Sequence, residues 1–162
     1  MSWIFRYTGA VITVLCAYFV SVGYKKYIKR AEREAEGFLS LIDYMRSRID
    51  CYLSTVLEIF SDFEDVAIDP FLSAVREGKS PKDALASVEK DLAIGREGRE
   101  ILHRLFSLVC GEYKAGVISV IDSSGASFSE YYERSKEEGR KNVRLLSALL
   151  LGASLGVVIL LI

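Results

Sequence analysis

The sequence is poor in the residues that most often carry out chemistry. Its 162 residues include one histidine, His103, and three cysteines, Cys16, Cys51 and Cys110, which lie far apart along the chain. Zinc sites need several ligands at short, regular spacing, so no metal centre is expected. His103 follows Leu102 in an amphipathic stretch, where a structural or surface histidine is the simpler interpretation. We predict no metal and no cofactor.

Motifs for phosphate binding and nucleophilic catalysis are also missing. GREGRE at 95–100 differs from G-x-x-x-x-G-K-[ST], and SSGAS at 123–127 differs from G-x-S-x-G. The balance of 21 basic and 22 acidic residues, with no basic block interleaved with aromatic residues, gives no sign of nucleic-acid binding. The sequence therefore predicts a protein that is not an enzyme and does not bind nucleic acid.

Charge is absent from one stretch near each end of the chain. Residues 7–24 and 145–162 each comprise 18 residues without Asp, Glu, Lys or Arg. An 18-residue helix rises roughly 27 Å, close to the hydrocarbon thickness of a bilayer, so we predict two transmembrane helices. The alternatives are a cleaved signal peptide for 7–24 and a buried core helix for 145–162. A signal peptide is disfavoured because residues 7–24 lack a small-x-small cleavage site before the charged run that follows. A buried core helix is disfavoured because a small domain rarely encloses a helix that is apolar all round.

Basic residues beside these stretches predict the topology. Five follow the first stretch and five precede the second, whereas Arg6 alone lies outside them. Basic residues near membrane spans tend to stay in the cytoplasm. We therefore predict a two-span protein of the cell membrane, with residues 25–144 cytoplasmic and both termini outside. The ten inner basic residues are Lys25, Lys26, Lys29, Arg30, Arg33, Arg134, Lys136, Arg140, Lys141 and Arg144.

Helical patterns dominate residues 25–144, and no alternating strand pattern of useful length appears. From Lys25 to about Ser61 there is no proline, and apolar residues recur mostly at spacings of three and four. No internal repeat, low-complexity stretch or linker interrupts the region, which therefore forms one domain. We predict an all-α fold, with a small cytoplasmic helical domain between an N-terminal and a C-terminal transmembrane helix.

Both prolines mark expected helix starts. Asp69 precedes Pro70 and is expected to be an N-cap, and Ser80 is expected to cap a helix whose first residue is Pro81. Gly78 lies between them, where a glycine commonly follows a helix C-terminus.

Two further glycines divide the second half of the domain. Gly95 and Gly98 are expected to form a break before a helix from Glu100 to Glu112. A last helix is expected to begin near Gly116 or Val117 and to continue into the second predicted span.

The second predicted span carries a pattern of small residues. Ala148, Gly152 and Gly156 are spaced by four, which favours close packing of this helix against another transmembrane helix. The alternative is that glycine is simply common in membrane helices. Neither span contains an ionisable Asp, Glu, Lys, Arg or His, so an ion pathway through this chain alone is not expected.

The arrangement resembles stage III sporulation protein AB of endospore-forming bacteria. The resemblance rests on GYKKYIKRAEREAEGFLSLIDYMRSRIDCYLSTVLEIF after the first span and on the final RLLSALLLGASLGVVILLI. Two features depart from the family pattern: Tyr52-Leu53 stands where a proline is often found, and the C-terminal glycines are spaced differently. The family is in turn similar to inner-membrane platform proteins of type II secretion and type IV pilus machines, whose G-x-S-x-x-x-A-L stretch resembles EGKSPKDAL at 77–85.

The resemblance implies a structural role. The expected function is a non-enzymatic platform or scaffold subunit of a sporulation-specific, secretion-like channel complex in the mother-cell membrane around the forespore. Its expected partners are a secretion-type ATPase on the cytoplasmic side, other membrane subunits of the complex and the lipid bilayer, with no nucleic acid. Two alternatives remain: a platform subunit of a general secretion or pilus machine, and a membrane-tethered sensor.

The predicted topology can be tested with reporter fusions. We expect a reporter inserted near Gly78 to be cytoplasmic and one fused after Ile162 to be external, because the basic residues flank the inner ends of both stretches. Alkaline phosphatase and fluorescent-protein fusions report the two sides of the membrane. The reverse pattern of activity would contradict the charge argument.

Overall fold

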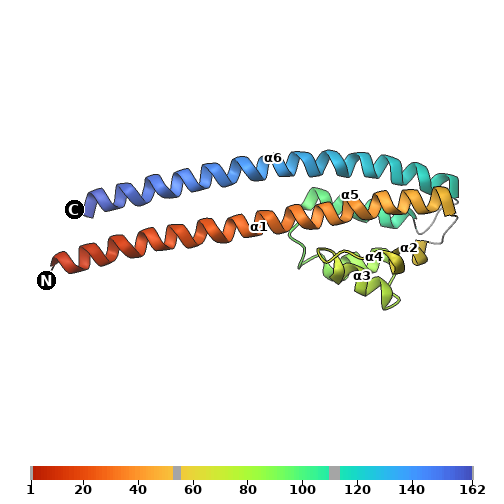
Figure 1. Ribbon diagram of the computed structural model, residues 1–162, viewed down its shortest axis with the longest axis horizontal. Coiled ribbons are helices and arrows are strands. Elements are labelled where there is room, and N and C mark those ends of the chain that lie inside the picture. The colour runs from red at the N-terminus through yellow and green to blue at the C-terminus, as the bar shows by residue number, and fades with distance from the viewer. Residues whose placement is uncertain (1, 53–55, 110–113, 162) are drawn as a thin grey trace. The chain divides into compact units, whose positions relative to one another are not determined.

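Every element that the structure describes is a helix. The computed structural model describes residues 2–52, 56–109 and 114–161, and the helices in these ranges are shown in Figure 1. They are α1 (Ser2–Tyr52), α2 (Val56–Asp62), α3 (Asp69–Arg76), α4 (Pro81–Val88), α5 (Arg96–Val109) and α6 (Lys114–Leu161). The predicted all-α fold is confirmed over the described residues.

The chain forms two compact units that share the two long helices. Unit 1 consists of Met1–Lys29 and Lys136–Ile162, and unit 2 consists of Arg30–Ser135. Both passages from one unit to the other lie inside helices, in α1 and in α6. The short helices α2 to α5 belong to unit 2 alone.

Within unit 1, α1 and α6 run in opposite directions and lie side by side (Figure 1). The hydroxyl groups of Ser21 and Ser147 are 3.1 Å apart and share a hydrogen bond. Nearer to unit 2, a Cβ atom added to Gly139 would lie 2.9 Å from Cγ2 of Ile28, so the side chain of any other residue would disturb this contact. Small residues therefore set the close approach and the register of the two helices.

Apolar side chains cover the outside of unit 1. On α1, Leu15 and Phe19 are 50% and 68% exposed, and on α6, Leu149 and Leu155 are 69% and 61% exposed. Such exposure is unfavourable in water, because each apolar side chain left in contact with solvent forgoes the free energy of burial. It is the expected state of helices that face lipid.

One described helical stretch, Val11–Ile49 in α1, is long and apolar enough to cross a membrane, and none of its apolar window is buried inside the structure. This finding is compatible with a membrane location of the N-terminal helix. The second predicted span, 145–162, remains a prediction. Its last residue, Ile162, lies outside the described residues.

Unit 2 is built around a cluster of aromatic rings. Phe38 of α1, Phe60 of α2, Phe71 of α3 and Phe106 of α5 are fully buried. The ring of Phe71 lies 5.3 Å from that of Phe38, 5.8 Å from that of Phe60 and 5.1 Å from that of Phe106, measured between centroids. Aromatic pairs at these separations contribute about 0.5–1.5 kcal/mol each beyond the burial of their surface. Phe71 thus joins α3 to three other helices, α1, α2 and α5.

The expected start of α3 is corrected by one residue. Ile68, not Asp69, is the N-cap, and no side chain caps this end. The Ile68 side chain is fully buried, and its carbonyl oxygen accepts hydrogen bonds from the backbone N–H groups of Phe71 and Leu72. Burial of Ile68 therefore fixes where the helix begins. Asp69 becomes its first residue, where its negative charge favours the positive end of the helix dipole.

The other end of α3 and the start of α4 follow local rules. Gly78 has a φ of +94°, and the N–H groups of Gly78 and Lys79 donate to the carbonyl oxygens of Val75 and Ala74. These two bonds form a Schellman motif, which favours glycine at this position. The Oγ atom of Ser80 then accepts from the backbone N–H of Asp83, with Pro81 as the first residue of α4.

The expected break at Gly98 is wrong. Gly98 is a buried residue of α5, which begins at Arg96, and a Cβ atom on it would lie 2.5 Å from the ring of Tyr131. Glycine is needed there for close contact with α6 and not for a turn. Helix α6 begins at Lys114, two or three residues earlier than expected, and Glu112 lies outside the described residues.

The central position of Phe71 predicts a large effect of its removal. We expect Phe71→Ala to lower the free energy of unfolding by about 3–5 kcal/mol, because it leaves a cavity among three other rings. Thermal and urea unfolding of the full chain in detergent would measure the change. Val66→Ala is the matched control, since Val66 is 95% exposed. Similar losses in both variants would contradict the proposed core.

Candidate functional site

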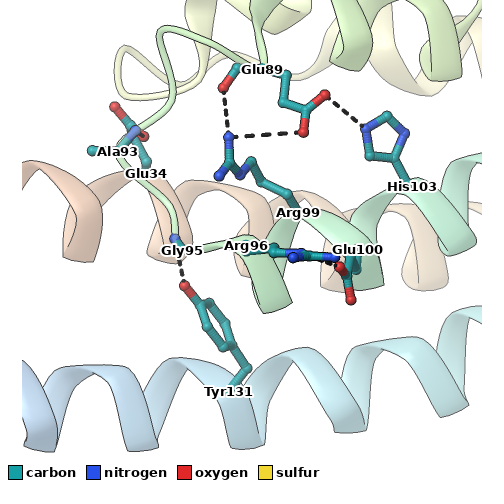
Figure 2. A network of polar contacts seen from close by, with 9 residues as sticks. All are labelled: Glu34, Glu89, Ala93, Gly95, Arg96, Arg99, Glu100, His103 and Tyr131. Atoms are coloured by element: carbon teal, nitrogen blue, oxygen red, sulfur yellow. Dashed lines mark hydrogen bonds and ion pairs between the residues drawn. The ribbon is translucent and has the colours of Figure 1, made fainter.

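A network of polar contacts surrounds the connection between α4 and α5 (Figure 2). The connection comprises residues 89–95, and side chains from α1, α5 and α6 approach it. All of these residues belong to unit 2. The network therefore ties a loop between two short helices to both long helices.

The α1 side of the network is a buried carboxylate. Glu34 is 3% exposed, and its Oε2 atom accepts a hydrogen bond of 2.6 Å from the backbone N–H of Ala93. Its Oε1 atom accepts one of 2.7 Å from Nε of Arg30, whose Nη2 atom also donates to the carbonyl oxygen of Asp91 at 2.7 Å. A buried charge is tolerated when it is paired and hydrogen-bonded, and Glu34 meets both conditions.

The α6 side of the network is a buried tyrosine. The hydroxyl oxygen of Tyr131 accepts a hydrogen bond of 2.9 Å from the backbone N–H of Gly95 (Figure 2). Its ring lies against Gly98, and only 7% of the residue is exposed. One turn further along α6, Arg134 forms an ion pair with Glu97 of α5. Glycine on α5 and tyrosine on α6 thus fit together at the same place.

On the α5 side of the network, Arg99 and His103 contact Glu89 of the connection. Arg99 donates from Nη1 to the carbonyl oxygen of Glu89 at 3.2 Å and lies 3.8 Å from its Oε1 atom. Nε2 of His103 lies 3.6 Å from Oε2 of the same carboxylate (Figure 2). Within the described ranges, no three His, Cys, Asp or Glu residues are placed to hold a metal ion. These contacts fix the position of α5 relative to the connection.

Comparison with protein families gives one match that covers nearly the whole chain. The model of the stage III sporulation protein AB family matches residues 6–162. The chain belongs to this family. It is therefore a sporulation-related protein, as the resemblance implied. Neither the curated proteins nor the solved structures gave a match.

The small residues singled out in the C-terminal helix of this sporulation protein AB family member face outward. Ala148, Gly152 and Gly156 are exposed, and a Cβ atom added to either glycine would meet nothing within 4 Å among the residues that the structure describes. The face of α6 that is buried or half-buried in unit 1 includes other residues: Gly139, Val143, Leu146, Ser147, Leu150 and Ser154. Packing of the exposed small residues against another helix stays a prediction.

Sequence reasoning missed Glu34 and Tyr131. Glu34 does carry a signal, because it lies four residues before Phe38 and seven before Leu41, which are both fully buried. A carboxylate in line with an apolar helix stripe indicates a buried partner. For Tyr131 no such signal exists, since its partner Gly95 is 36 residues away.

Loss of the Glu34 carboxylate is expected to loosen the network. We predict that Glu34→Ala lowers the free energy of unfolding by about 1–3 kcal/mol, because a buried carboxylate that accepts two hydrogen bonds is removed. Glu36→Ala is the matched control, since Glu36 is an exposed carboxylate two residues away. Denaturant unfolding of the full chain in detergent compares the two. Equal losses in the two variants would show that the buried contacts of Glu34 do not contribute to the free energy of unfolding.

Proposed function

We propose that this protein is a non-enzymatic platform subunit of a sporulation-specific, secretion-like complex between mother cell and forespore. In this role it spans the mother-cell membrane twice and couples a cytoplasmic ATPase to other membrane subunits. The sporulation setting is supported by the family match over residues 6–162. The platform role is supported by the way the two long helices are shared between the units.

The network around residues 89–95 is the observation that most favours coupling. Glu34 holds this connection from α1, and Tyr131 holds it from α6. A partner that binds the short helices of unit 2 would therefore act on both long helices at once. The same two helices supply all of unit 1. In the proposed complex, unit 2 receives the ATPase and unit 1 contacts the membrane subunits.

The charge of unit 2 suits a basic partner surface. Residues 30–135 contain 13 basic and 20 acidic residues, although the whole chain is nearly neutral. Opposite charge on a partner speeds encounter and disfavours wrong partners. We therefore expect the ATPase to meet unit 2 through a surface rich in Lys and Arg.

Purification of the tagged chain from its host tests the proposal. We expect an ATPase and other membrane proteins to co-purify from sporulating cells and not from growing cells, because the family is sporulation-related. Mass spectrometry of the purified material identifies the partners. The same partners in growing cells would favour a general secretion or pilus machine. A chain without partners at either stage would contradict the platform role.

A pair of variants tests whether the exposed small residues bind other membrane subunits. We expect Gly152→Leu to reduce co-purification several-fold, because a Cβ atom added there meets nothing within 4 Å among the described residues, whereas the larger side chain would hold a neighbouring helix away. Ala153→Leu is the matched control, since Ala153 is exposed and lies outside the Ala148, Gly152 and Gly156 series. The yield of captured subunits per tagged chain is the measurement. Equal yields from both variants would show that this face is not an interface.

A further inference from the structure

Positive charge is concentrated in unit 1. This unit contains eight basic and two acidic residues, whereas unit 2 has an excess of acidic residues. Apart from Arg6, all of the basic residues of unit 1 lie in two short segments, 25–29 and 136–144. The near-neutral total charge of the chain conceals this separation.

The register of α1 and α6 brings the two basic segments to one level. Ser21 and Ser147 are in contact, and the helices run in opposite directions from that point. At about 1.5 Å per residue, Lys25 to Lys29 lie roughly 6–12 Å beyond Ser21 along α1. Arg144 to Arg140 lie roughly 5–11 Å beyond Ser147 along α6, in the same direction. The contact between Ile28 and Gly139 confirms this alignment.

Five of these cations have no partner in the part of the chain that the structure describes. They are exposed, and none forms an ion pair or a hydrogen bond there through its side chain. Lys141 differs, because it forms an ion pair of 2.8 Å with Glu137. That hydrogen bond lowers the pKa of Glu137 and raises the pKa of Lys141, so both stay charged over a wider range of pH. The five cations, called here the basic collar, are Lys25, Lys26, Lys29, Arg140 and Arg144.

The collar lies at the edge of an apolar surface. On one side of it are the exposed apolar side chains of α1 and α6, including Phe19 and Leu149. Tyr27, which is 54% exposed, lies among the collar residues, and tyrosine is enriched where membrane proteins meet lipid headgroups. Cations beside a tyrosine and an apolar band are placed to meet phosphate groups at the membrane surface.

We propose that the basic collar binds the headgroups of anionic phospholipids in the cytoplasmic leaflet. This inference rests on the membrane location in the proposed function. The cations are distributed over two helices at one level, as a leaflet of headgroups requires. Bound lipid would neutralise the five cations and hold the two helices at a fixed depth.

Lipid analysis of the reconstituted full chain tests the collar. The chain is placed in vesicles of equal phosphatidylcholine and phosphatidylglycerol, extracted in mild detergent and purified, and the retained lipids are measured by mass spectrometry. We expect the ratio of phosphatidylglycerol to phosphatidylcholine retained on the chain to exceed the ratio in the vesicles by roughly fivefold, the factor that one basic residue near an anionic surface supplies. In K25Q/K26Q/K29Q the ratio should fall close to that of the vesicles.

The matched control is K79Q/K82Q/K90Q, which removes three exposed lysines from unit 2. This variant should retain the wild-type enrichment. An unenriched wild type, or equal loss in both triple variants, would overturn the collar. Sodium phosphate that strips the lipid more than sodium chloride of equal ionic strength would point to a free-phosphate site and would also overturn it.

A carbonate wash of the vesicles separates failure of the collar from failure of the membrane location. If the wash releases the chain, both proposals fail. If the chain stays in the vesicles without enriched phosphatidylglycerol, only the collar fails, and the platform role stands.

Discussion

Contact among four phenylalanine rings is the interaction on which unit 2 depends. Helices α2, α3 and α4 have only seven or eight residues each, and isolated helices of this length are unstable in water. They form because Phe60 and Phe71 bring α2 and α3 against Phe38 of α1 and Phe106 of α5. Helix α4 follows directly on α3, and its fully buried Ala84 and Leu85 join the same core. Tertiary packing thus supplies the stability that local propensity lacks.

Polar contacts fix the positions of the helices around this apolar core. An apolar cluster alone tolerates small rotations and shifts of its helices, whereas hydrogen bonds with fixed donors and acceptors do not. Glu34 and Tyr131 each bind one backbone N–H group of the same connection, Ala93 and Gly95, two residues apart. The connection can therefore form both hydrogen bonds only in one position relative to α1 and α6. Unit 2 combines a nonspecific source of stability with a specific source of alignment.

The sequence was sufficient for the features that local chemistry decides. Helical periodicity predicted an all-α fold, Ser80 and Pro81 predicted the start of α4, and Gly78 predicted the end of α3. It was insufficient for features that depend on contacts between residues far apart in the chain. Asp69 was expected to cap α3, but burial of Ile68 sets that end, and Gly98 was expected to break the chain, but it accommodates the ring of Tyr131. The two hydrogen bonds that join the connection to the long helices could not be predicted, since they join residues 59 and 36 positions apart.

Helix α6 presents small residues on two different faces of unit 1. One face, with Gly139 and Ser147, already contacts α1, and the other, with Gly152 and Gly156, is exposed. A helix with a single small-residue face must give up its partner within the chain before it can bind another helix closely. Here the hairpin of α1 and α6 can stay closed while α6 accepts a neighbour. In terms of valency, each chain of the proposed complex would enter the assembly already folded, so that recruitment of subunits would not compete with the contact between α1 and α6.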